Sequence, residues 1–367
     1  MIKIKHSDLI SIVTKAYLFA DTAKTARVPY NLIRIVKEKN KISATCSNAS
    51  VICTFTCGCE DDGDFDFATN AVRFFDVIKN WQASEEINFQ IQEGKVTLKA
   101  KAKKVTISCA IDEGYWAGRG PSADYSFIFK ATEIKKIISA VSFSSSKTAF
   151  DVAHRCLLIE SAGNGQVVFA AHEGFRMASA VVKNDTLSGT FRVLVEAEMI
   201  NSALRSFGTD EEIYFVIGPS RVDIFNSNSW VGVGIVPAKY PDISIVRNMS
   251  YPYSYKVKSS DIVAISKSIS SVIRNTDRPR SARFSVGEEG IRIFAAADDG
   301  DVEDILPSVT VSGKSFDEVK GCDIVYFAEP CQFFSEVVLH TGPEKKQGYI
   351  FTTEELEGWT YHLLATR

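Results

Sequence analysis

Three short stretches of the sequence hold residue types that could do chemistry. The segment CTFTCGC brings Cys53, Cys57 and Cys59 close together, and thiolates are good zinc ligands. The segment AHEGFRM starts at Ala171 with a His-Glu pair like the one that opens a zinc-protease helix. Gly232–Gly234 reads GVG, a fragment of a dinucleotide-binding loop. Each stretch needs partners elsewhere in the chain before it can form a site.

Those partners are missing from the sequence. No CxxC pair or histidine cluster joins the cysteines, whose spacing fits a strand followed by a turn. AHEGFRM lacks the second histidine that a zinc protease requires, and GVG has no following helix. No GxSxG or Walker A motif occurs, and the five histidines are scattered. We therefore expect no catalytic residue, no metal and no cofactor; an enzyme would require a site that these patterns do not reveal.

Composition, net charge and cysteine content limit the classes of protein to which this chain can belong. Apolar residues make up 45% of the chain, charged residues 24%, and the formal net charge is −3. No run of 18 or more apolar residues is present, so we expect no membrane span. The opening MIKIKHSDL lacks the apolar stretch of a secretory leader, and the eight unevenly spread cysteines fit a reducing compartment. These features predict a cytoplasmic protein.

The strongest pattern is a helix that returns three times. ATEIKKIISAV places Ile134, Ile137, Ile138 and Val141 at i, i+3, i+4 and i+7, which is one face of a helix. HSDLISIVTKAY and SSDIVAISKSIS have the same spacing. A serine or threonine near each start is the expected N-cap: Ser7, Thr132 and Ser260. The three segments start about 125 to 130 residues apart, which indicates three tandem modules.

Each module repeats one order of elements. After the first helix come short runs rich in β-branched residues, then a second helix, then more such runs. The second helices are expected in NAVRFFDVIKNW, with Asn70 as N-cap, in EAEMINSALRSF and in EPCQFFSEVVLH. This order predicts an α+β fold of three modules, each with two helices packed on antiparallel sheet, at residues 1–123, 124–250 and 251–367.

Basic residues on these helices are the remaining signal. They are Lys15, Arg73, Lys79, Lys135, Lys136, Lys267 and Arg274. Lys24 and Arg27 stand in the loop after the first helix. A solvated polar face is the ordinary interpretation, but lysine and arginine also suit a surface that holds phosphates without reading bases. If the three modules surround an axis with their helices on one side, these charges share one surface.

The repeat and four local segments resemble the bacterial DNA polymerase sliding clamp, the β subunit of the replicative polymerase. The segments are NAVRFFDVIKNW, FAAHEGFRMASA, AKYPDISIV and the closing YHLLATR, in the order found in that family. The resemblance covers nearly the whole chain. It implies three repeats of the DNA-clamp fold in a ring-forming head-to-tail homodimer, and a non-catalytic processivity factor that encircles duplex DNA without sequence specificity and tethers the polymerase.

The resemblance also implies three kinds of site. The DNA-facing residues would be Lys15, Lys24, Arg27, Arg73, Lys79, Lys136 and Lys267. The dimer contact would use the edge strand KKVTISCA with Val105 and Ile107, and Ile273 on the other side. A pocket for short linear peptides from DNA polymerase, the clamp loader and repair proteins would be formed by His154, His172, Gly174, Phe175, Arg176, Met177, Pro241, Val246, Leu363, Leu364, Ala365, Thr366 and Arg367.

A second function class stays open. The same modules could serve as a protein-interaction scaffold that does not bind DNA. Retention on closed circular DNA, with release on linearisation, separates the two classes, because only a closed ring depends on the topology of the DNA.

Overall fold

A computed structural model describes residues 2–23, 29–59, 63–82, 85–110, 126–273, 281–287, 290–297, 300–307, 309–312, 316–344 and 346–365. Within these ranges it has seven α-helices: α1 His6–Tyr17, α2 Ala71–Lys79, α4 Ala131–Ser142, α5 Ala197–Arg205, α6 Ser244–Arg247, α7 Ser259–Val272 and α8 Ile324–Ala328. None of the described helices is long and apolar enough to cross a membrane. The chain forms two compact units, Met1–Thr132 with Ser202–Ile235, and Glu133–Asn201 with Val236–Arg367.

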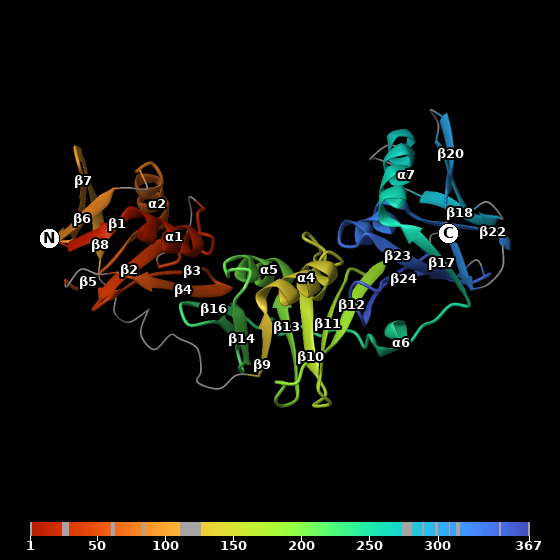
Figure 1. Ribbon diagram of the computed structural model, residues 1–367, viewed down its shortest axis with the longest axis horizontal. Helices are drawn as coiled ribbons and strands as arrows, with labels where there is room; N and C mark the ends of the chain where they lie inside the picture. Colours follow the sequence, from red (N-terminus) through yellow and green to blue (C-terminus); the bar gives the residue numbers. More distant parts are fainter. Residues whose placement is uncertain are drawn as a thin grey trace. The chain divides into compact units, whose positions relative to one another are not determined.

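The first unit is built on one twelve-stranded sheet. Its order is β1-β6-β7-β8-β5-β2-β3-β4-β16-β15-β14-β9. The strands are β1 Ile2–Lys5, β2 Leu32–Glu38, β3 Lys41–Ser47, β4 Val51–Gly58, β5 Phe65–Asn70, β6 Glu86–Gln92, β7 Lys95–Ala100, β8 Lys103–Ala110, β9 Phe127–Lys130, β14 Glu212–Ile217, β15 Arg221–Phe225 and β16 Ser229–Gly234. Helices α1 and α2 lie side by side, and α1 packs on β3 and β4 (Figure 1).

The second unit has a nine-stranded sheet, ordered β13-β10-β11-β12-β25-β24-β23-β17-β21, and a four-stranded sheet, ordered β20-β19-β18-β22. The strands are β10 Cys156–Ser161, β11 Gln166–His172, β12 Arg176–Lys183, β13 Phe191–Glu196, β17 Tyr253–Lys258, β18 Ser281–Gly287, β19 Gly290–Ala297, β20 Gly300–Leu306, β21 Val309–Ser312, β22 Phe316–Asp323, β23 Glu336–Thr341, β24 Tyr349–Thr352 and β25 Trp359–Leu363. Two 3-10 turns, η1 Val152–Arg155 and η2 Glu329–Gln332, complete it.

A strand that runs directly into a helix is the repeating device of the fold. It occurs six times, in β1–α1, β5–α2, β9–α4, β13–α5, β17–α7 and β22–α8, with no residue between the two elements. Three further strands follow each of these six helices, except α7, which is followed by the four strands β18 to β21. In each module the leading strand of one half pairs in the sheet of the other half: β1 pairs β6, and β5 pairs β2. Each predicted module is therefore two interlocked strand–helix–three-strand halves.

The amphipathic spacing correctly locates the long helices. In α1 the buried residues include Leu9, Ile12, Val13 and Ala16, and burial of each large aliphatic side chain contributes about 1.5–3 kcal/mol. Asn70 is confirmed as an N-cap, because its side chain accepts the backbone N–H of Arg73. The antiparallel α+β fold class is confirmed as well. The module boundaries at residues 123 and 250 stay a prediction.

Two kinds of local prediction are wrong. The helices with predicted caps at Ser7 and Ser260 start earlier, at His6 and Ser259, and their N-cap residues make no side-chain cap bond. The residue at the N-cap position of both helices is a lysine, Lys5 or Lys258, and a lysine side chain has no acceptor for a backbone N–H. The predicted cap Thr132 likewise lies inside α4, which starts at Ala131.

The segment EPCQFFSEVVLH is not a helix. It contains η2, with proline in its first turn, and then strand β23. Proline lacks an N–H, and the β-branched EVVLHT favours a strand. The second helix of this region is the shorter α8, capped by Asp323 through the N–H groups of Val325 and Tyr326.

Candidate functional site

A pocket of about 170 Å³ opens on the second unit and contains many of the residues predicted to bind peptides. Its walls come from the end of β11, the start of β12, the end of β25 and the chain that follows β16. The lining residues are His172, Gly174, Phe175, Arg176, Met177, Pro241, Asp242, Ile243, Val246, His362 and Leu364.

The floor of the pocket is one row across three strands. His172 lies opposite Met177 in the β11–β12 pair, and Met177 lies opposite His362 in the β12–β25 pair. Directly opposed residues of antiparallel strands project from the same face of a sheet. The pairing register therefore brings two imidazoles to one face with a methionine between them, about 10 Å apart at a strand spacing near 4.8 Å.

The chain after β16 forms the opposite wall. Tyr240 and Ile243 are buried in an apolar cluster with Met177 and Ala170, and the Tyr240 hydroxyl donates to the Ala170 carbonyl at 3.2 Å. Burial raises the pKa of Tyr240 far above its usual value, so this phenol stays protonated as a donor. The wall is therefore anchored to the sheet by both packing and a hydrogen bond.

The rim of the pocket is apolar and exposed. Phe175 is 68% exposed and Leu364 is 55% exposed, and the Leu364 N–H donates to the Phe175 carbonyl at 3.0 Å. Ile245 on α6 is also an exposed large apolar residue. Exposed apolar side chains that gather at a cavity mark an interaction site more than single ones do.

The pocket histidines are buried enough to favour the neutral imidazole. Burial, and next the nearby His154, lower the pKa of His172, with Asp151 opposing them. Burial, and next Arg247, lower the pKa of His362 to about 4. His172 makes edge-to-face ring contacts with His154 at 4.8 Å and with Tyr240 at 4.7 Å between centroids. At neutral pH these rings act as uncharged hydrogen-bonding groups.

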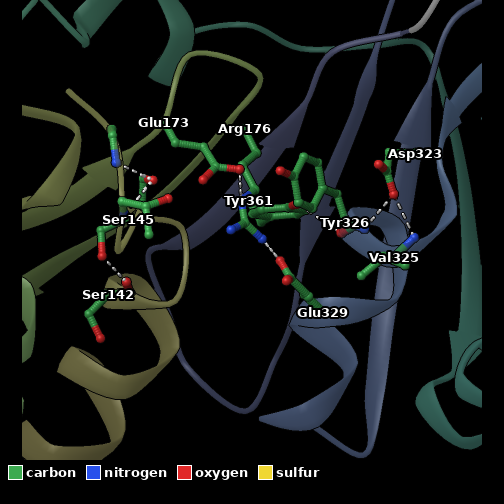
Figure 2. Close-up of polar contacts among 12 residues, drawn as sticks. Ser142, Ser145, Glu173, Arg176, Asp323, Val325, Tyr326, Glu329 and Tyr361 are labelled. Atoms are coloured by element: carbon green, nitrogen blue, oxygen red, sulfur yellow. Dashed lines mark hydrogen bonds and ion pairs between the residues drawn. The ribbon is translucent and has the colours of Figure 1, made fainter. Parts of the chain in front are cut away.

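Arg176 ties the pocket to the helical side of the same sheet (Figure 2). Its Nε lies 2.8 Å from Glu173, and its Nη1 forms an ion pair with Glu329. Its guanidinium stacks 4.1 Å from the ring centroid of Tyr326, which favours a cation. Tyr361 on β25 donates to the Tyr326 carbonyl at 2.8 Å. One arginine thus joins the loop before β12 to α8 and η2.

Most predicted pocket residues with a described position come together. His154 does not line the cavity, but its ring contacts His172 and lies 3.9 Å from a methyl group placed on Gly174. Leu363 is buried and pairs with Arg176 in the sheet. Ala365 does not line the cavity, and Thr366 and Arg367 lie outside the described residues.

Three lining residues were not predicted: Asp242, Ile243 and His362. The alternation in WTYHLLATR could have indicated His362, because Tyr361 and Leu363 point to the other face.

The other predicted sites are spread over both units. Arg73 and Lys79 on α2, Lys136 on α4 and Lys267 on α7 are exposed, whereas Lys15 is half-buried with its Nζ 5.9 Å from the Phe55 ring. Lys24 and Arg27 lie outside the described residues.

The predicted dimer residues are largely packed within the chain. Ile107 is buried, Ile273 is buried after α7, and Val105 is half-buried. Strand β8 pairs with β7 from Lys103 to Ser108 but with β5 at only Ala110 and Cys109, so most of its second edge has no strand beside it among the described residues.

Comparison with solved structures decides the fold. The β subunit of DNA polymerase III from Pseudomonas aeruginosa is 15% identical, with all of this chain and 99% of that chain covered at a TM-score of 0.86. The β subunit from Streptococcus pyogenes is 16% identical, with 100% and 99% covered at 0.90. The chain has the sliding-clamp fold. The Thermotoga maritima β subunit matches this clamp fold equally fully, at 13% identity and a TM-score of 0.86. No family model and no curated protein matches the sequence.

Within the clamp fold, the described residues hold no group of three or more His, Cys, Asp and Glu side chains that could bind a metal ion. The cysteines of CTFTCGC lie in and just after β4, and burial raises the pKa of Cys53 and of Cys57 to about 12. Thiols with such pKa values are poor ligands and poor nucleophiles at neutral pH. The candidate site is a pocket with an apolar rim and a polar floor.

Proposed function

We propose that this protein is a DNA polymerase processivity factor, a clamp that encircles duplex DNA and tethers a polymerase and other proteins through short peptides. The full-length likeness to sliding clamps carries this proposal. A tether raises the effective concentration of polymerase at the primer end, with no catalysis by the clamp itself.

Strand pairing within the chain supports a head-to-tail homodimer. The third strand after one helix of a module pairs with the corresponding strand of the neighbouring module: β4 pairs β16, and β12 pairs β25. Two strands in the same position, β8 of the first module and β20 of the third, have no such partner strand among the described residues. Strand β20 is an end strand of its sheet. An open edge favours pairing with another strand, so β8 of one chain would join β20 of a second chain.

The charges of these two strands are complementary. Strand β8 begins with exposed Lys103 and Lys104, and β20 exposes Asp301, Glu303 and Asp304. Opposite charges on adjacent strands stabilise a pair, and like charges destabilise it. The attraction favours β8 against β20 and disfavours two copies of β8 or two copies of β20. The dimer would therefore be head-to-tail.

Contact with DNA would come from helix faces. Exposed Arg73, Lys79, Lys136 and Lys267 lie on α2, α4 and α7, and Lys79 already contacts Asp76 at 2.5 Å. So small a number of cations on the described helix faces predicts weak phosphate binding with a shallow salt dependence. A closed ring holds DNA by topology and needs little affinity.

Retention on DNA circles tests the proposal. The protein is loaded by a clamp loader or by transient ring opening onto nicked circular duplex, and gel filtration at moderate salt separates bound from free protein. We expect co-elution with the circle and loss after a restriction enzyme linearises it. Absence of retention on either DNA would refute the clamp and favour the DNA-independent scaffold. Equal retention on circular and linear DNA would refute encirclement and indicate ordinary DNA binding.

A paired set of variants tests peptide capture separately. Phe175→Ser and Leu364→Ser remove exposed apolar rim, and each should weaken binding of an apolar probe peptide at least tenfold while leaving the melting temperature unchanged. Leu18→Ser, at another exposed leucine in the first unit, is the control. Deletion of the last five residues is a poorer test, because Leu363 belongs to the nine-stranded sheet. Unchanged affinity in both rim variants would place peptide capture elsewhere.

A further inference from the structure

The floor of the pocket contains polar atoms that the described protein leaves without a partner. The Nε2 atoms of His172 and His362 are both buried and make no hydrogen bond among the described residues. His362 is only 7% exposed and lines the cavity. Buried polar groups normally have partners, so these nitrogens point to an occupant that supplies one.

A cation lies at the edge of the pocket. Arg247 is the last residue of α6 and follows Val246, which lines the cavity, and its charge contributes to the lowered pKa of His362. Among the described residues Arg247 makes no ion pair, and its side chain has no hydrogen bond. The half-buried guanidinium is therefore a cation without an anionic partner among the described residues.

The acids around the pocket already have partners. Asp242 accepts the Ser244 N–H at 2.9 Å, Asp151 accepts the Ala153 N–H at 2.9 Å, and Glu173 pairs with Arg176. None of them forms an ion pair with Arg247 among the described residues. An anionic group on a ligand would therefore complement this cation.

We propose that the peptide captured by this pocket presents a carboxylate, which binds between Arg247 and His362 while apolar side chains of the peptide pack on the rim. This inference rests on the proposed peptide-binding function. The carboxylate is either an aspartate or glutamate side chain or the free C-terminus of the peptide.

Access to the imidazole requires a small movement. The His362 Nε2 atom is buried, so for a ligand to reach it the ring turns about its Cβ–Cγ bond, or Leu364 moves aside. Leu364 follows the last residue of β25 and is more than half exposed, so it can move without breaking the sheet.

A carboxylate beside His362 makes affinity depend on pH. The titratable or charged groups described around the pocket are Tyr240, Asp242 and Arg247 on α6 and the chain before it, His172 on β11 with His154 and Asp151 behind it, and the Glu173–Arg176 ion pair at the start of β12. Strands β12 and β24 contribute Met177 and Ile350 opposite the ring. An anion offsets both the burial and the repulsion by Arg247 that disfavour the imidazolium, so binding takes up a proton.

The size of the effect follows from linkage. If the carboxylate restores His362 from a pKa of about 4 to an ordinary value near 6.5, affinity rises about tenfold between pH 7.5 and pH 5.5. A glutamine peptide has no such charge, and its affinity should change less than twofold.

The probes are capped hexapeptides of two leucines, one phenylalanine and three serines. One serine at a time is replaced by glutamate or by glutamine, and one further peptide has a free C-terminus instead of an amide. Calorimetry with the full-length protein at pH 7.5 and pH 5.5 gives the affinities. We expect at least one carboxylate peptide to bind more tightly than its amide partner and to gain about tenfold at pH 5.5. The position that gains identifies the source of the carboxylate.

Two variants test whether Arg247 and His362 cause the preference for a carboxylate and its dependence on pH. Arg247→Gln should reduce the preference for the carboxylate at both pH values, and His362→Gln should remove the gain at pH 5.5. His340→Gln is the matched control, because His340 is a half-buried histidine on β23 that bonds Thr352 outside the pocket. Should His362→Gln fail to fold, NMR titration of the wild-type imidazoles decides: bound carboxylate peptide must raise the pKa of His362.

The results distinguish failure of the carboxylate inference from failure of the proposed peptide binding. Equal affinity of glutamate and glutamine peptides at both pH values would overturn the carboxylate inference and leave peptide capture intact. Absence of binding by every probe at millimolar concentration would overturn both.

Discussion

Replacing Arg176 by methionine should loosen the contact between the pocket loop and α8. The guanidinium sits between Glu173 and Glu329, whose side chains are 12% and 24% exposed, and over the ring of Tyr326. Methionine retains much of the apolar stem of arginine but supplies no charge. Two carboxylates would then lie near each other, largely out of water, with no cation between them.

The expected cost is at the lower end of the range for a broken buried ion pair. Removal of one partner typically costs about 3–5 kcal/mol, because it leaves an uncompensated charge. Glu329 retains some contact with water, which screens part of this cost. We therefore expect about 3 kcal/mol, equivalent to roughly a hundredfold rise in local opening.

Hydrogen exchange reports this opening residue by residue. The N–H groups of Val325 and Tyr326, which bond to Asp323, should lose up to two orders of magnitude of protection in Arg176→Met. Amides of α1 in the first unit should not change. A global unfolding curve is less informative, because a chain with two compact units need not unfold in one step.

Two further variants make the test sharp. Arg192→Met breaks a more exposed pair with Glu160, so it should cost less than about 1 kcal/mol. Adding Glu173→Gln and Glu329→Gln to Arg176→Met should restore most of the protection, because no buried charge is then left alone. If Arg176→Met behaves like Arg192→Met, the reasoning from burial is wrong.

Three other predictions follow from single contacts. Asn70→Ala removes the cap bond to the Arg73 N–H and should cost about 1 kcal/mol, measured as lost exchange protection at the start of α2. Lys104→Glu should weaken self-association in sedimentation at micromolar concentration, and adding Glu303→Lys should restore it if the two strands meet; no rescue would argue against that pairing. His362 has a pKa of about 4 when folded and near 6.5 when unfolded, so the unfolded chain binds the proton first. Stability should fall by up to about 3 kcal/mol from pH 6.5 to pH 4, and the fall should be smaller in His362→Gln.

The long elements could be predicted from the sequence because each carries its own periodicity. Ile134, Ile137, Ile138 and Val141 have the spacing of a helix and are all buried. The turn at Glu93 and Gly94 was also predictable, and both residues have positive φ, as a tight hairpin requires. Local patterns of this kind need no knowledge of distant residues.

The leading strands escaped prediction for a physical reason. Ile2–Lys5, Phe65–Asn70 and Phe127–Lys130 are only four to six residues long, and no turn separates them from the helices that follow. Their pairing is with strands of the other half-module, so nothing near them in sequence indicates a partner. The threefold repeat was visible, but the sixfold strand–helix repeat was not.

The lining residues of the pocket all lie in segments that resemble the clamp family, but the resemblance indicated only some of them. It indicated His172, Gly174 and Phe175 in FAAHEGFRMASA. It did not indicate His362, which becomes part of the floor through the register of β12 with β25. A shift of that register by one residue would turn His362 to the helical face and bring Leu363 into the pocket. Site composition therefore depends on a pairing between strands some 180 residues apart in the chain.

The pairing of β12 with β25 bears on both self-association and peptide binding. Joining β12 to β25 closes a continuous sheet in the second unit and forms the pocket floor, and joining β4 to β16 closes the sheet of the first unit. Among the described strands β8 and β20 are left by this rule, one in each unit, with opposite charge. A second copy of the chain could therefore pair its β20 with this β8. That contact would be the same kind of strand pairing that already joins β4 to β16 and β12 to β25. The peptide pocket would then be complete in each chain before assembly, so Lys104→Glu should weaken self-association and leave the affinity for probe peptides unchanged. Loss of both together would show that the pocket depends on the dimer.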